Sequence, residues 1–210
     1  LANEKDREAM ENQRRIAERA LYASARNTHL AATNLRKEYD AGGKTEPALK
    51  EEYLALYASA VRLYKTFVTQ YPESDYAYEF TYYQGEALFF SEKYMEAVEQ
   101  YKWVRDHRDL SEAYFLDAAK SILASYEAEV AKQVDAGALP ELRVPSSDEL
   151  KALPQPLTPM PIPALYLELQ AQWDDYQNVV NDPKTAPQQG INAALVSLAY
   201  LHVDDAIARM

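Results

Sequence analysis

The segment from Phe67 to Val104 constrains the fold more than any other part of this chain. It reads as a helix, a break, a second helix, a tight turn and a third helix. Pro72 cannot continue the first helix, and Ser74 or Asp75 can cap the free amides at the start of the second. The sequence therefore predicts that the chain turns back between neighbouring helices at this point.

Two small residues stand twelve positions apart in this segment, Gly85 and Ala97. We expect them to face each other, because small side chains let two helix backbones approach closely. Tyr101 and Val104 would then fill the flanking groove. A large residue at either small position would push the helices apart.

The composition favours an all-α chain. Only five of the 210 residues are glycine, and no run of alternating β-branched residues competes with the helical pattern. The chain is 48% hydrophobic and has 17 tyrosines, which is enough for a sizeable core. The expected helices cover residues 3–40, 46–71, 75–91, 93–108, 111–135 and 165–180, with Asn-Asp-Pro at 181–183 ending the sixth and a last helix beginning near Pro187.

Residues 137–163 differ sharply from the rest, because seven prolines prevent any sustained helix there. We interpret this segment as an insertion between two helices. Residues 1–72 are then expected to form a long N-terminal helical hairpin that ends in a repeat-like helix, and residues 73–210 to form helical repeats interrupted by the insertion.

The spacing of Gly85 and Ala97 returns at Ala194 and Ala206, and HVDDAI at 202–207 mirrors KYMEAV at 93–98. The chain therefore stops just inside the second helix of a repeat. We expect further repeats downstream, since a repeat array that halts in mid-unit exposes an apolar face. The alternative is a natural terminal cap.

Residues 60–104, and most of all FVTQYPESDYA and YYQGEALFFSEKYMEAVEQY, resemble the tetratricopeptide repeats of bacterial periplasmic and envelope proteins of the Tol-Pal cell-division coordinator and outer-membrane assembly lipoprotein types. A motif of the form Tyr-Pro-x-Ser-x-Tyr-Ala, just before the helix that contains the glycine position of the repeat, carries much of the resemblance. It is matched by Tyr71, Pro72, Ser74, Tyr76 and Ala77.

The resemblance implies antiparallel helix pairs stacked as a right-handed superhelix. It also implies a non-enzymatic scaffold or adaptor that contacts other proteins, a periplasmic or outer-membrane-associated location, and no cofactor. The positions that match the repeat pattern are Ala60, Tyr64, Phe67, Pro72, Gly85, Ala97 and Tyr101, with a weaker echo at Ala194 and Ala206.

In such repeats the first helix of each pair lines a concave surface, and here that helix is unusually aromatic. The residues expected to face a protein or peptide partner are Glu79, Tyr82, Glu86 and Phe89, extended by Lys120 and Leu123 on the next such helix. The alternative is that Tyr82 and Phe89 pack under the proline-rich insertion or against another repeat. Residues 157–166 are either a ligand that covers this aromatic surface from within the chain or a surface loop.

Charge and residue content argue against several functions. The net charge of −11 would repel a nucleic-acid backbone, and cysteine is absent, so neither a disulfide nor a cysteine metal site can form. The three histidines, His29, His107 and His202, lack the spacing of metal ligands, so we expect no metal. No stretch reaches the ~20 apolar residues of a membrane span, and we expect a soluble chain.

Two other functions stay open. A helical enzyme is the lesser hypothesis, because the only cluster of a histidine with carboxylates is His202 with Asp204 and Asp205. The other is a structural homo-oligomer in which the helix at 3–40 pairs with a second copy. Its stripe is rich in Ala and Thr and lacks leucine heptads, so packing within the chain is favoured, and the oligomeric state is not determined by the sequence.

Overall fold

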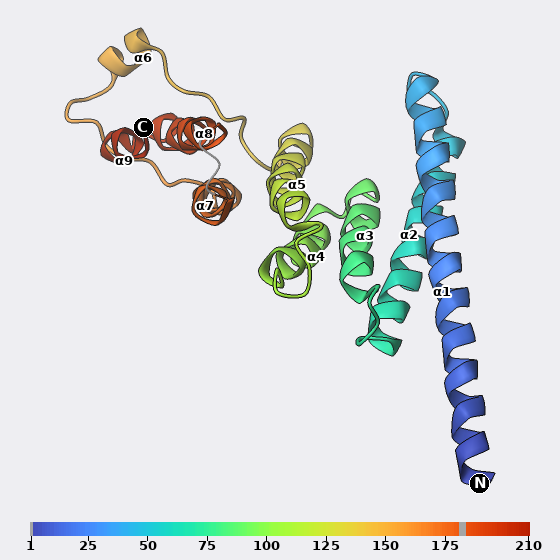
Figure 1. The fold of residues 1–210 in the computed structure, drawn as a ribbon. Coiled ribbons are helices and arrows are strands. Elements are labelled where there is room, and N and C mark those ends of the chain that lie inside the picture. Colours follow the sequence, from blue (N-terminus) through green and yellow to red (C-terminus); the bar gives the residue numbers. More distant parts are fainter. Residues whose placement is uncertain (1, 181–183) are drawn as a thin grey trace. The chain divides into compact units, whose positions relative to one another are not determined.

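A computed structural model describes residues 2–180 and 184–210, so the expected helix end at 181–183 lies outside the described residues. The described part is helical and contains no strand, which confirms the all-α prediction (Figure 1). The helices are α1 (Ala2–Ala41), α2 (Pro47–Gln70), α3 (Ala77–Phe90), α4 (Tyr94–Asp106), α5 (Phe115–Asp135), α6 (Ser147–Ala152), α7 (Ala164–Val180), α8 (Ala186–Ala199) and α9 (Val203–Arg209).

The chain divides into two compact units, Leu1–Phe115 and Leu116–Met210. The sequence suggested a boundary after residue 72. In the structure α2 packs on α3 as well as on α1, so the first unit continues through α4. None of the described helices is long and apolar enough to cross a membrane.

In the first unit, α1 and α2 form the expected helical hairpin. Gly43 and Lys44 have φ angles of +75° and +62°, a left-handed conformation that ends α1 and reverses the chain. The aromatic stripe of α2 then packs against α1 on one side and α3 on the other. The fully buried members of this core include Tyr57, Ala60, Tyr64, Phe67 and, from α3, Phe80.

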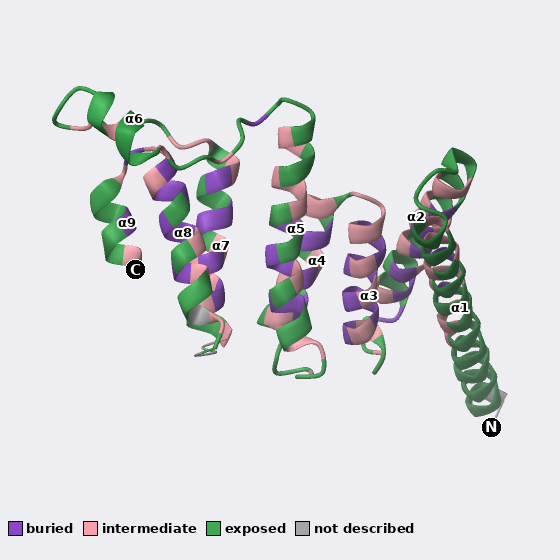
Figure 2. Ribbon diagram, turned by 90° about the horizontal axis from the view of Figure 1, so that it is seen from above, coloured by how far each residue is buried: buried purple, intermediate pink, exposed green. Residues whose placement is uncertain are grey.

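The first part of α1 contributes nothing to this core, because residues 3–17 are all exposed. Figure 2 shows the same contrast, with exposed residues along the N-terminal part of α1 and buried residues on α2 and α3. The buried residues of α1 are Ala25 and Ala32.

The break between α2 and α3 lies where Pro72 predicted it. Ser74 shapes this turn through its carbonyl, which accepts a hydrogen bond from the Ala77 amide, and its hydroxyl, which accepts one from the Tyr76 amide. Tyr76, rather than Ser74 or Asp75, is the residue that precedes the first turn of α3, and it makes no side-chain cap.

Gly85 lies at the contact of α3 with α4, beside Tyr101, which was predicted to fill the groove flanking the two small residues. A Cβ atom added to Gly85 would lie 2.7 Å from Cε1 of Tyr101. The space beside Gly85 is therefore filled by the Tyr101 ring. Ala97 is fully buried, and Tyr101 is 2% exposed.

In the second unit, α7 packs on α8 and α8 packs on α9. Ala194 and Ala206, the predicted echo of the repeat, are both buried. Helices α8 and α9 also come close at Gly190, where an added Cβ would be 2.8 Å from the backbone oxygen of Arg209. This glycine was not singled out by the sequence analysis.

The proline-rich segment 137–163 is irregular apart from the short α6. A capping box starts α6, in which Ser146 accepts from the Glu149 amide and Glu149 accepts from the Ser146 amide. Further on, the Met160 amide donates to the Tyr200 carbonyl, and Nε2 of His202 lies 2.8 Å from the Met160 carbonyl oxygen. The segment is thus bonded to the α8–α9 turn of its own unit.

Candidate interaction site

A hollow of about 170 Å³ opens between α1 and α3 in the first unit, with α2 at its base. We call it the α1–α3 hollow. Because residues three or four positions apart share a helix face, one stretch of α1 supplies four of its side chains. The lining residues are Arg26, His29, Leu30 and Thr33 of α1, Tyr64 of α2, and Tyr83 and Glu86 of α3.

His29 and Tyr64 form the polar base of the hollow. Nδ1 of His29 shares a hydrogen bond of 2.9 Å with the Tyr64 hydroxyl. The His29 ring also makes edge contacts with the rings of Tyr57, Tyr64 and Tyr83, at centroid distances of 5.6–6.0 Å. These aromatic contacts hold the imidazole in one orientation.

Burial sets the charge of this base. Burial, together with the nearby Arg26 and Arg36, lowers the pKa of His29 to about 4. Burial also raises the pKa of Tyr64. At neutral pH the base of the hollow therefore offers two uncharged hydrogen-bonding groups.

Arg26 and Glu79 close one wall of the hollow. Nη1 of Arg26 lies 2.7 Å from Oε1 of Glu79, and its guanidinium carbon lies 5.1 Å from the centre of the Tyr83 ring. This ion pair joins α1 to α3, whose residues are 53 positions apart in the sequence. Both side chains remain partly exposed, so the pair is accessible to a partner.

The six residues predicted to face a partner lie in different environments in the structure. Glu86 lines the hollow and Glu79 bonds to Arg26 at its edge, so these two lie at one site. Phe89 is half-buried against Phe90 and Tyr94, with ring centroids 5.3 and 5.2 Å away.

The prediction that Tyr82 faces a partner is wrong. Tyr82 is 8% exposed and stacks on Tyr114 at a centroid distance of 4.4 Å. Consecutive helical residues point about 100° apart, so Tyr83 reaches the hollow while Tyr82 points toward Tyr101 of α4. Tyr82 is buried, as the alternative interpretation required, but its ring neighbours are Tyr101 and Tyr114 rather than the proline-rich insertion.

Lys120 and Leu123 lie on α5, in the second unit. Lys120 is exposed, as expected. Leu123 is only 7% exposed, so the prediction that it contacts a partner is wrong. It belongs to the same buried stripe as Ala119, Ile122 and Tyr126.

The sequence analysis missed Arg26 and His29 as parts of a site. A signal was present, because His29 stands four residues after Ala25 and three before Ala32, the two buried residues of α1. That spacing places the imidazole at the edge of the buried face. Its partners on α2 and α3 cannot be found from α1 alone.

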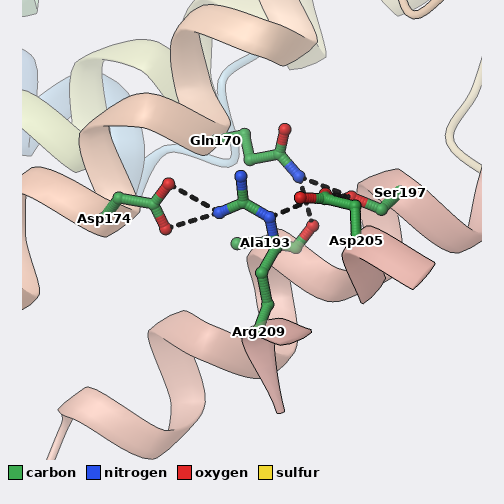
Figure 3. Close-up of polar contacts among 6 residues, drawn as sticks. All are labelled: Gln170, Asp174, Ala193, Ser197, Asp205 and Arg209. Carbon is green, nitrogen blue, oxygen red and sulfur yellow. Dashed lines mark hydrogen bonds and ion pairs between the residues drawn. The ribbon is translucent and has the colours of Figure 1, made fainter. Parts of the chain in front are cut away.

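The second unit contains a polar network that links three helices (Figure 3). Nη1 of Arg209 on α9 lies 2.7 Å from Oδ1 of Asp174 on α7, and Nε of Arg209 lies 2.8 Å from Oδ2 of Asp205. The buried Ser197 hydroxyl donates to the same oxygen of Asp205, and the Gln170 amide donates to Ser197 at 2.7 Å. Because these groups satisfy one another, the network holds α9 onto α7 and α8.

His202 lines one pocket with Asp204 and Asp205, the carboxylates predicted to cluster with it, but no hydrogen bond between described residues joins its ring to either of them. Its ring is bonded to Met160, while Asp205 bonds Ser197 and Arg209. Within residues 2–180 and 184–210, no group of three or more His, Asp or Glu side chains is arranged to hold a metal ion.

Comparison with known proteins adds no identification. No family model matches the chain, and no curated protein or solved structure matches it either.

Proposed function

We propose that the chain is a non-enzymatic scaffold that binds a protein or peptide partner at the α1–α3 hollow. The observation that carries the proposal is the hollow itself, in which an accessible ion pair, neutral polar groups and the exposed Leu30 converge from helices far apart in the sequence. Leu30 is 59% exposed, so it offers apolar surface at the rim.

The size of the hollow favours a side-chain anchor over a small-molecule site. Pockets for small ligands and cofactors usually have volumes of about 300–1,000 Å³, and this one has about 170 Å³. A single side chain of a partner fits that volume. The Arg26–Glu79 ion pair beside it supplies both a donor and an acceptor for the partner's backbone or neighbouring side chains.

The order of helix packing supports a repeat architecture of the tetratricopeptide type. In the first unit α1 packs on α2, α2 on α3 and α3 on α4, and in the second α7 packs on α8 and α8 on α9. Helical repeat proteins are built from such nearest-neighbour contacts and use their extended surfaces to bind other proteins. The resemblance of residues 60–104 to envelope repeat proteins adds a role in the bacterial cell envelope to the proposal.

Leu30→Asp tests the proposal, with Leu110→Asp as its matched control. Both leucines are about equally exposed, at 59% and 60%, but only Leu30 lines the hollow. Each purified variant would be used to capture proteins from a bacterial envelope extract, with circular dichroism to verify folding. We expect a partner that the wild-type protein and Leu110→Asp both capture to be lost, by about tenfold or more, with Leu30→Asp.

The opposite result would refute the proposal. If Leu30→Asp remains folded and captures the same proteins in the same amounts as Leu110→Asp, the hollow is not the binding site.

A further inference from the structure

A second groove lies on the other side of α3, between α2 and α4. We call it the α2–α4 groove. Its volume is about 420 Å³, and its apolar lining comes from Val61 and Val68 of α2 and Leu88 of α3. Leu88 stands two residues after Glu86 of the hollow, which places the two side chains about 200° apart around the helix axis. The groove and the hollow are therefore separate surfaces of the first unit.

Gln84 lines this groove with a polar group that the protein leaves unsatisfied. The side chain is 7% exposed, and its Oε1 has no hydrogen-bond partner among the residues that the structure describes. Buried amide oxygens nearly always accept a hydrogen bond, so this one points to a donor supplied from outside. The oxygen itself is enclosed in the free protein, and the soft terminal torsion of the side chain allows it to turn toward the groove when a donor is present.

The charges around the groove define the donor. Glu96 and Glu99 of α4 lie on its α4 side and are both exposed. Glu96 has a loose contact of 3.6 Å with Lys93, whereas Glu99 has no ion pair within 4 Å in the described part of the chain. Lys65 of α2 also lines the groove and is exposed, so the lining carries two carboxylates and one ammonium group. The excess of negative charge, the unbonded amide oxygen and the net charge of −11 together favour a cationic side chain.

We propose that the α2–α4 groove is a second protein-binding surface, which takes an amphipathic segment of a partner with an arginine beside an aliphatic residue. Arginine presents five donors in a planar fork, so one edge can bond the Glu99 carboxylate while another donor reaches the Gln84 oxygen. The aliphatic residue packs on Val61, Val68 and Leu88. This surface does not depend on the function of the α1–α3 hollow.

Two fluorescent model peptides test this assignment. Both are helical 16-residue chains of alanine and leucine, one with arginine at every fourth position and the other with glutamate at those positions. Fluorescence anisotropy at ~0.15 M salt, where charges farther apart than ~8 Å are largely screened, measures their affinity for the full chain. We expect the arginine peptide to bind and the glutamate peptide to bind at least about tenfold more weakly.

Three variants locate the binding. Glu99→Gln should weaken the arginine peptide about fivefold, whereas Glu51→Gln, an equal charge change at an exposed position of α2 outside the groove, should change it less than about twofold. Gln84→Leu should also weaken binding about fivefold while leaving the melting temperature of the free protein unchanged or higher, because it removes an unsatisfied buried group.

Three outcomes would overturn the proposal. They are equal loss of affinity in Glu99→Gln and Glu51→Gln, equal affinity for the two peptides, and no binding of the arginine peptide at ~1 mM, the limit of a weak complex. Glu86→Gln, on the side of the α1–α3 hollow, should not affect binding. A result that refutes binding at the α2–α4 groove is thereby distinguished from one that refutes binding at the α1–α3 hollow.

Discussion

Replacing Gly85 with alanine tests the contact that sets the spacing of α3 and α4. The added Cβ would lie 2.7 and 2.9 Å from two carbons of the Tyr101 ring, closer than nonbonded carbons come. The ring cannot swing out of the way, because Tyr101 is 2% exposed and is flanked by Tyr82 at a centroid distance of 5.7 Å. The helices must move apart or the ring must leave its preferred rotamer.

Two opposing contributions set the change in unfolding free energy of Gly85→Ala. Alanine stabilises a helix relative to glycine by about 1 kcal/mol. Overpacking a well-filled core costs about 1–3 kcal/mol, and two contacts below 3 Å place this site in the upper half of that range. We therefore expect Gly85→Ala to lower the free energy of unfolding of the first unit by about 1–2 kcal/mol, and its melting temperature by about 4–8 °C.

Urea and thermal unfolding followed by circular dichroism would measure this change, and hydrogen exchange of α3 and α4 would locate it. Gly42→Ala is the matched control, because an added Cβ there lies no closer than 3.4 Å to any neighbour and should be nearly neutral. The double variant Gly85→Ala, Tyr101→Leu gives a further test, since the smaller leucine side chain relieves the clash. It should lose about 1 kcal/mol less unfolding free energy than the sum of the losses in the two single variants.

The reasoning is refuted if Gly85→Ala is as stable as the wild-type protein. Strict additivity with Tyr101→Leu would contradict it as well.

Three more predictions concern pH and the polar network. His29 has a folded pKa of about 4 against about 6.5 when unfolded, so the unfolded chain binds a proton first as pH falls. Stability should be complete above about pH 6.5 and fall by about 2 kcal/mol at pH 5, and urea unfolding of His29→Gln should lack this step. Arg209→Ala leaves Asp174 and Asp205 without their shared cation, so hydrogen exchange in α9 should accelerate about tenfold, whereas Arg143→Ala at an exposed ion pair should leave it unchanged. Hydrogen bonds from Ser197 and Arg209 lower the pKa of Asp205, so this carboxylate stabilises the folded chain above the ordinary aspartate pKa, and the stabilisation is lost as pH falls through the lower folded value. The wild-type protein should therefore lose more stability on acidification than Arg209→Ala, and identical acid profiles would refute this prediction.

The helices themselves could be predicted closely. The expected segment 46–71 corresponds to Pro47–Gln70, and 93–108 corresponds to Tyr94–Asp106. Proline and glycine breaks and three- and four-residue spacings are local signals, which is why they suffice. The short α6 was missed although Ser146 and Glu149 carry the spacing of a capping box, since the prolines around it dominated the interpretation.

The candidate site could be predicted only in part. Glu79 and Glu86, which were predicted to face a partner, lie at the α1–α3 hollow, but their neighbours Arg26 and His29 come from a helix about fifty residues earlier. The aromatic α3 was recognised as too rich for one buried stripe. The structure shows that it packs on two sides, with Phe80 and Tyr83 toward α2 and Tyr82 toward Tyr101 and Tyr114.

The sequence by itself determined that this chain is a series of helices, where most of them begin and end, and which side chains are small enough for close packing. Backbone hydrogen bonding and helix propensity act within a few residues, so they can be read locally. Only the tertiary structure decided how tightly the Tyr101 ring fits against Gly85, and that Tyr82 lies inside while Leu30 lies outside. Those outcomes depend on how each helix is rotated against its neighbours, which is set by the summed packing of side chains distant in the sequence.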